Sequence, residues 1–220
     1  HYATAPQPAV TPSSDVICND TEVNLALSSN IPSTTWTWTV ASPLQITGAS
    51  GNNSGLLSSI VQTLHNSDVA VHSVTYTITP TVYGQCELAP VTAEALVNPT
   101  PQIQVNPAEQ TICYGESSTI TVTTPNTSVS GQWLYNLTVN ADPGISGNIT
   151  GGTYTEPTNL TEILFNDATE IRKATYRFTP RITPSDGGDD CTGPEQIVTI
   201  SVYPRVRYEK ALSNYNGYNI

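Results

Sequence analysis

Thr75-Tyr76-Thr77-Ile78-Thr79-Pro80 returns in the second half of the chain as Thr175-Tyr176-Arg177-Phe178-Thr179-Pro180. The residues upstream repeat as well, since each half opens on an isoleucine–cysteine pair, Ile17-Cys18 and Ile112-Cys113. Self-similarity at this period is typical of an array of small domains, in which each copy is one structural unit. The sequence therefore predicts two tandem modules.

Apolar and polar side chains alternate along several short segments of both copies. Alternation places the apolar residues on one face of a β-strand. Pro80 and Pro180 are expected to end their strands, because proline cannot donate a hydrogen bond to a ladder. The residues predicted to face inward are Val23, Leu25, Leu27, Val91, Ala93, Ala95 and Val97 in copy one, and Ile120, Val122, Val198, Ile200 and Val202 in copy two.

Residues 161–172 could be drawn as a short helix, but their counterparts around 60–66 alternate like a strand and precede Asn-Ser-Asp turn residues. We therefore predict a strand that runs into a turn in both copies. About seven short strands per copy indicate an all-β chain of two tandem immunoglobulin-like β-sandwiches. Trp38 and Trp133 each stand 20 residues after a cysteine. They are predicted to be equivalent core residues, together with Tyr76 and Tyr176.

Four cysteines lie at matching places, two in each copy. No pair has the two-residue spacing of zinc ligands, and the histidines of copy one have no counterparts in copy two. The pattern predicts one disulfide within each module, Cys18–Cys86 and Cys113–Cys191. Disulfides persist in oxidising compartments, so we expect an extracellular protein.

The module boundary is expected at Asn98-Pro99-Thr100-Pro101, where the prolines leave little slack and favour a semi-rigid rod. The predicted organisation is a linker over residues 1–9, a first sandwich over 10–99, a second over 100–204, and the start of a following repeat or linker over 205–220. A chain without methionine that opens on His1 is expected to be a fragment of a longer polypeptide.

Composition excludes several classes of function. Charged residues make up only 11% of the chain and its formal net charge is −11. Nucleic acids and anionic membranes are therefore poor partners. No apolar run is long enough to span a bilayer, which argues against membrane insertion. No catalytic motif, cofactor motif or phosphate-binding loop is present, so we expect no enzymatic activity, no cofactor and no metal centre.

Three features could still bind a ligand or carry a modification. Asp186, Asp189 and Asp190 lie on a glycine-containing loop and could contribute to a calcium site, although a solvated turn is the favoured interpretation. Trp36 could stack on a sugar ring, but an inward or edge-packed ring is favoured. His65 and His72 are interpreted as exposed polar residues. The possible glycosylation triplets begin at Asn19, Asn52, Asn126, Asn136, Asn148 and Asn159.

The combined pattern resembles the PKD-like domains of large surface proteins from Bacteroidetes. The residues that carry the resemblance in copy one are Ile17-Cys18, 36–40, 74–80, Cys86 and 97–99, and copy two keeps the same frame. Residues 213–220 resemble the opening of a repeat in SprB-type gliding-motility adhesins. This resemblance implies type IX secretion, a bacterial cell-surface location, and neighbouring repeats, gliding machinery or surface polysaccharide as partners.

Two kinds of function remain open. The first is a structural spacer or adhesive segment of a secreted adhesin, acting in gliding motility and surface attachment. The second is a carbohydrate-binding module, or an accessory segment of a secreted polysaccharide-degrading enzyme, in which a sheet face or Trp36 would contact the glycan.

Overall fold

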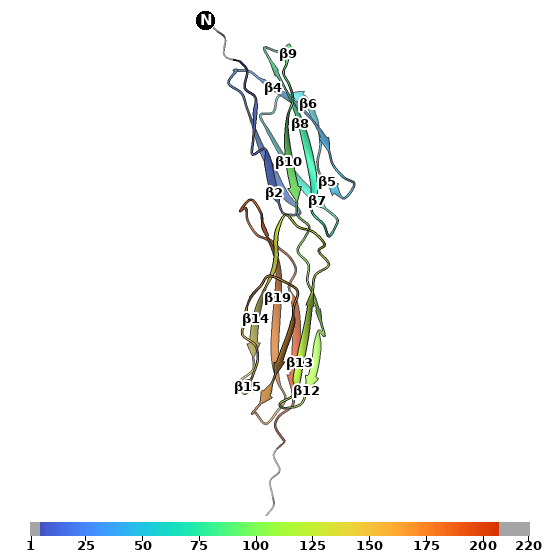
Figure 1. The fold of residues 1–220 in the computed structure, drawn as a ribbon, viewed down its shortest axis with the longest axis vertical. Coiled ribbons are helices and arrows are strands. Elements are labelled where there is room, and N and C mark those ends of the chain that lie inside the picture. The colour runs from blue at the N-terminus through green and yellow to red at the C-terminus, as the bar shows by residue number, and fades with distance from the viewer. Residues whose placement is uncertain (1–4, 207–220) are drawn as a thin grey trace, which may run out of the picture.

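The computed structural model describes residues 5–206, and every regular element among them is a β-strand. Two β-sandwiches stack end to end along the long axis of the molecule (Figure 1). We call them module 1 (β1–β10) and module 2 (β11–β21). Within the described range, no helix is long and apolar enough to cross a membrane. Residues 1–4 of the predicted linker and 207–220 of the predicted following repeat lie outside the described residues.

Module 1 has two facing sheets. The smaller has the order β1-β3-β7-β5, and the larger has the order β2-β10-β8-β4-β6, with β9 paired to β8. β2 runs parallel to β10, whereas the other pairs are antiparallel. The bounds are β1 Ala9–Thr11, β2 Ser14–Ile17, β3 Thr21–Ser28, β4 Thr35–Ala41, β5 Ile46–Thr47, β6 Asn52–Gly55, β7 Ser59–Asn66, β8 His72–Val82, β9 Cys86–Glu87 and β10 Val91–Val97.

Module 2 repeats this plan. Its larger sheet has the order β12-β21-β19-β14-β16, with β20 paired to β19, and faces the sheet β11-β13-β17 and the pair β15-β18. The bounds are β11 Gln104–Asn106, β12 Glu109–Ile112, β13 Ser117–Thr123, β14 Gly131–Ala141, β15 Ile145–Ser146, β16 Gly152–Tyr154, β17 Asn159–Ile163, β18 Phe165–Asn166, β19 Arg172–Pro184, β20 Cys191–Thr192 and β21 Gln196–Val202.

Each module has its own hydrophobic core between its two sheets. The predicted inward faces are confirmed: β3 buries Val23, Leu25 and Leu27, and its exposed residues lie between them. The strand that runs into a turn is also confirmed in both copies, because β7 ends at Asn66 and β18 ends at Asn166. Two separate cores mean that each sandwich is stabilised largely by its own buried apolar area.

One buried asparagine holds the same corner in each module. The Asn66 side-chain amide donates to the carbonyls of Ala70 and Val97, both at 2.9 Å. Asn166 donates in the same way to Glu170 and Val202, both at 2.8 Å. These bonds fix the end of the closing strand, from which the chain leaves the module.

The prediction that Pro80 and Pro180 end their strands is wrong, because β8 continues to Val82 and β19 to Pro184. The Pro80 carbonyl accepts from Leu88 N at 2.9 Å, on the side of β8 that β9 and β10 share. In antiparallel pairing a residue's N–H and C=O point to the same side. The missing donor of Pro80 therefore falls in the gap between β10, whose pairing stops at Ile78, and β9.

The tryptophan alignment also needs correction. Trp36 pairs with Pro80, whereas the residue opposite Pro180 is Tyr135. Trp133 lies opposite Ile182, close to the turn that joins β19 to β20, whereas Trp38 lies opposite Ile78. The two tryptophans therefore do not occupy equivalent positions. The equal spacing of 20 residues is therefore a coincidence. The segment between the cysteine and the strand is longer in module 2, and Trp133 lies correspondingly earlier in its strand than Trp38 does.

Candidate functional site at the junction of the two modules

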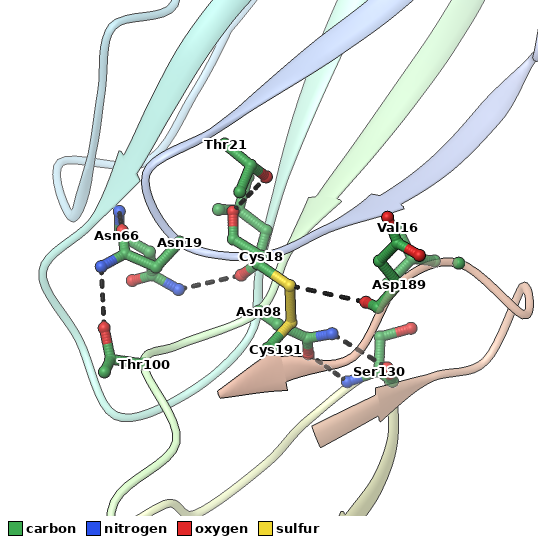
Figure 2. Close-up of a disulfide and its surroundings, with 12 residues drawn as sticks. Val16, Cys18, Asn19, Thr21, Asn66, Asn98, Thr100, Ser130, Asp189 and Cys191 are labelled. Atoms are coloured by element: carbon green, nitrogen blue, oxygen red, sulfur yellow. Dashed lines mark hydrogen bonds between the residues drawn. A yellow bond between two sulfur atoms is a disulfide. The ribbon is translucent and has the colours of Figure 1, made fainter. Parts of the chain in front are cut away.

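A disulfide crosses from module 1 to module 2. Cys18 follows the end of β2, Cys191 begins β20, and their Cα atoms are 5.3 Å apart (Figure 2). Both predicted pairings, Cys18–Cys86 and Cys113–Cys191, are therefore wrong. Cys86 and Cys113 are exposed and carry free thiols.

The predicted pairings fail because the two cysteines of one module lie at opposite ends of its sandwich. Cys18 follows the stretch of β2 that pairs with β10 up to Val97, and Val97 pairs with His72. Cys86 pairs with Val82 at the other end of β8. Ten residues separate 72 from 82, which is about 33 Å of strand, whereas a disulfide requires Cα atoms within about 7 Å.

Asn98 forms a second tie across the junction. Its side-chain oxygen accepts from Ser130 N at 2.7 Å, and its side-chain amide donates to Ser130 O at 3.0 Å (Figure 2). The backbone N–H of Asn98 donates to Ile17 O at 2.8 Å. The side chain is fully buried, so these bonds are shielded from water.

Backbone atoms form a third tie beside the β7–β8 turn. Val71 N donates to Ser128 O at 3.0 Å, and Thr127 N donates to Val69 O at 3.1 Å. Ala70 and Ser128 form an isolated parallel bridge between the modules. The junction is therefore held at several separated points rather than by the linker alone.

The linker itself is packed against both modules. Asn19 donates from its side chain to Thr100 Oγ1 at 2.8 Å. A Cβ atom on Gly193 would lie 1.8 Å from the Pro101 carbonyl oxygen, so only glycine lets the linker approach this closely. The predicted proline-bearing junction thus has a defined path along the surface of module 2.

The aspartate loop contributes to the junction. Asp186 accepts from Val16 N of module 1 at 2.9 Å and from Gly188 N at 3.0 Å. Asp190 forms an ion pair with Arg181 at 2.9 Å. Residues 185–190 are exposed, in agreement with the predicted solvated turn, but the turn also contacts module 1 through Asp186. Residues 5–206 contain no group of three or more His, Cys, Asp or Glu placed to hold a metal ion.

Asp186 also affects the titration of a carboxyl in module 1. Burial, followed by the negative charge of Asp186, raises the pKa of Asp15 above its usual 3.8. Backbone hydrogen bonds from Val16 and Asn24 act in the opposite direction. The junction therefore brings together two carboxylates that repel each other when both are ionised.

The remaining candidate residues do not gather at one site. Trp36 is 3% exposed and cannot stack on a sugar ring. Trp38 is equally buried and donates from Nε1 to Ser50 O at 3.0 Å, whereas Trp133 is half-buried against the core of module 2. Tyr76 and Tyr176 are fully buried.

Two histidines of module 1 each lie within hydrogen-bond distance of an aspartate. His65 Nδ1 lies 2.7 Å from Asp20 Oδ1, and His72 Nε2 lies 2.8 Å from Asp68 Oδ2. The hydrogen bond from His72 lowers the pKa of Asp68. Asn19 and Asn126, which begin two of the glycosylation triplets, use their side-chain amides in hydrogen bonds at the junction.

Comparison with known proteins agrees with this architecture. A family model described as "PKD-like domain" matches the chain twice, over residues 15–101 and 110–206. No curated protein sequence matches.

Solved structures of similar fold include the I-band fragment I67–I69 of titin, at 9% identity over 92% of this chain and 66% of that chain, with a TM-score of 0.47. The D1–D4 ectodomain fragment of ICAM-5 is 12% identical over 92% of this chain and 50% of that chain, with a TM-score of 0.42. The D00–D0 domain of intimin is 10% identical over 88% and 98%, with a TM-score of 0.40. The chain thus spans half to two thirds of the length of the titin and ICAM-5 fragments.

Proposed function

The chain belongs to the PKD-like domain family in two tandem copies, and from this we propose that it is a load-bearing spacer in a secreted bacterial surface adhesin. The single observation that carries the proposal is the Cys18–Cys191 disulfide across the junction. It lies between modules stacked in series, with the chain entering at one end of the molecule and leaving at the other (Figure 1).

The position of the disulfide determines which part of the chain can lengthen under tension. A pull on the two ends passes from Cys18 directly to Cys191 through the S–S bond. The chain between the two cysteines is a loop closed by this bond, with a sequence separation of 173. A pull on the two ends therefore cannot extend this loop. Fully extended, such a length would span about 600 Å. The disulfide therefore withholds most of the extension that unfolding of both modules would give.

The hydrogen bonds at the junction add stiffness to this covalent limit. Asn98 and the Val71–Ser128 contact hold the modules in one relative orientation, so the pair acts as a straight spacer. Such a segment sets the distance of a distal binding region from the cell and requires no ligand pocket. The burial of Trp36 leaves a sheet face as the one surface on which the carbohydrate-binding alternative can rest.

Single-molecule stretching tests the mechanical role. The oxidised chain, pulled from its two ends, should lengthen by far less than the Cys18→Ser/Cys191→Ser variant, with a difference of about 600 Å. The Cys86→Ser/Cys113→Ser variant is the matched control and should behave like the parent. Equal extension of all three proteins would contradict the proposal.

We infer that the parent adhesin acts in gliding motility and leaves the cell by type IX secretion, from the resemblance of residues 213–220 to a repeat of such adhesins. Antibodies against the two modules should label intact gliding cells, and labelling should disappear when type IX secretion is disrupted. Unchanged labelling in the secretion mutant would refute this assignment.

A further inference from the structure

The two free cysteines occupy the positions that the disulfide uses at the internal junction. In module 1, Thr21 N donates to Cys18 O at 3.3 Å, and in module 2 Glu116 N donates to Cys113 O at 3.1 Å. The preceding residues match too: Ile17 accepts from Asn98 N, and Ile112 accepts from Tyr203 N. Cys113 is therefore the counterpart of Cys18, at the far end of module 2.

Cys86 is the counterpart of Cys191 by the same criterion. Cys86 pairs with Val82, two residues after Pro80, and Cys191 pairs with Ile182, two residues after Pro180. Each sits in the short strand that folds back on the longest strand of its module. The chain thus presents one cysteine of each kind at its two outer ends.

Equivalent residues are buried at the internal junction and exposed at the outer ends. Cys191 is 3% exposed where module 1 covers it, whereas Cys86 is exposed. Asn98 is fully buried against module 2, whereas its counterpart Tyr203 is 48% exposed. Among residues 5–206, each outer end is therefore an uncovered version of a surface that is covered at the junction.

The uncovered surface beside Cys113 is apolar and hollowed. A depression of about 460 Å³ is lined by Cys113, Tyr114, Tyr203, Pro204 and Val206, and we call these five residues the distal face. Tyr114 and Tyr203 stand where the internal junction has Asn19 and Asn98. The partner of the distal face should therefore offer apolar contacts where Ser130 offers hydrogen bonds.

We propose that the distal face docks a further PKD-like module, and that Cys113 forms with that module's hairpin cysteine the disulfide that Cys18 forms with Cys191. Cys86 is the complementary group at the other end of the chain. The disulfide thus becomes a repeating connection that links each module covalently to its neighbour. The inference extends the proposed spacer function, on which it rests for its biological setting only.

The reaction requires an oxidant, which we take to be a disulfide such as oxidised glutathione. The Cys113 thiolate attacks one sulfur of that disulfide, breaks its S–S bond and releases one glutathione thiolate. The thiolate of the partner module's cysteine then attacks the Cys113 sulfur and releases the second glutathione thiolate. Two protons leave the protein thiols and two electrons reduce glutathione.

The test uses two variants of the 220-residue chain as each other's partner. Cys86→Ser keeps Cys113, and Cys113→Ser keeps Cys86. An equimolar mixture in glutathione redox buffer should give Cys86–Cys113 heterodimers in about tenfold excess over both homodimers combined, as counted from the disulfide-linked peptides in a non-reducing peptide map read by mass spectrometry. Absence of dimers, or the random result with as many heterodimers as homodimers, would overturn the inference.

A third variant separates docking from simple thiol reactivity. Tyr203→Asp in the Cys86→Ser chain places a charge on the distal face and should reduce the excess to the random value. Its Cys18–Cys191 disulfide, read in the same peptide map, reports that the chain has folded. Persistent tenfold excess would show that the distal face plays no part. Failure here leaves the stretching result intact, because that experiment depends on Cys18 and Cys191 alone.

Discussion

Gln62 of module 1 and Glu162 of module 2 perform the same task with different charge. Each accepts the hydroxyl hydrogen bond of a buried tyrosine, Tyr76 or Tyr176, and each also accepts a backbone N–H from the facing loop. Burial, then the hydrogen bond to Glu162, raises the pKa of Tyr176. For Tyr76, burial raises the pKa to about 12. The two modules therefore provide an internal comparison of a neutral and a charged acceptor.

Glu162→Gln should cost less than about 1 kcal/mol in the free energy of unfolding, because the amide oxygen can replace the carboxylate as it does in module 1. Glu162→Ala should cost about 1–3 kcal/mol, because it leaves the buried Tyr176 hydroxyl without an acceptor. Urea denaturation of both variants checks the order. Equal losses would show that the hydrogen bond contributes nothing beyond packing.

Asp15→Asn should stabilise the protein at neutral pH. The folded state raises the pKa of Asp15, so it binds the proton more tightly than the unfolded chain does. The stabilising contribution is therefore present below the unfolded value of 3.8 and is lost as pH rises through the folded pKa. The melting temperature of the variant should exceed that of the parent at pH 7 and match it near pH 3.

Asp68→Asn is the control of opposite sign for that titration. The pKa of Asp68 is lowered in the folded state, so its contribution is present above 3.8 and is lost as pH falls through the folded pKa. Asp68→Asn should lower the melting temperature at pH 7 and have little effect in acid. The same pH profile for both variants would contradict the assigned directions.

Trp38→Ala should destabilise module 1 more than Trp133→Ala destabilises module 2. Trp38 is 3% exposed and its indole N–H is hydrogen-bonded, so its removal should cost about 3–5 kcal/mol. Trp133 is only half-buried, and its indole nitrogen has no hydrogen-bond partner within the described part of the chain. Denaturant midpoints of the two variants check this order, and equal shifts would contradict it.

The parts of the structure that depend on alternation were predictable from sequence. The inward positions of β3 and β10, such as Leu25 and Ala95, follow from a period of two residues, which reports burial directly. The strand ending at Asn166 followed from its match to the segment ending at Asn66. Both inferences use local patterns that the two copies share.

The disulfide was not predictable from the same evidence. Two cysteines at matched positions in each copy fit pairing within modules and staggered pairing between modules equally well. The length of β8 distinguishes the two kinds of pairing, because the span from His72 to Val82 separates Cys18 from Cys86. This length was not evident from the sequence, which suggested that the strand ends at Pro80. The contact of Asp186 with Val16 had one faint signal: its loop carries aspartates that the counterpart around Tyr83 lacks.

Loss of the disulfide alone should leave the modules aligned, whereas additional loss of Asn98 should loosen the junction. In Cys18→Ser/Cys191→Ser the two Asn98–Ser130 bonds and the Val71–Ser128 contact remain, so a spin-label distance between the modules should keep a narrow distribution. Adding Asn98→Ala removes two buried hydrogen bonds, worth about 2 kcal/mol together, and leaves Ser130 with unpaired backbone groups. The distance distribution should then broaden clearly, and scattering should show a wider range of shapes.

The matched control for this prediction is Asn24→Ala, on an exposed face of β3, which should leave the distance distribution unchanged. Asn66→Ala is not suitable, because it disturbs the corner of the module itself. A broad distribution already in the double cysteine variant would mean that the hydrogen bonds at the junction cannot hold the modules without the S–S bond.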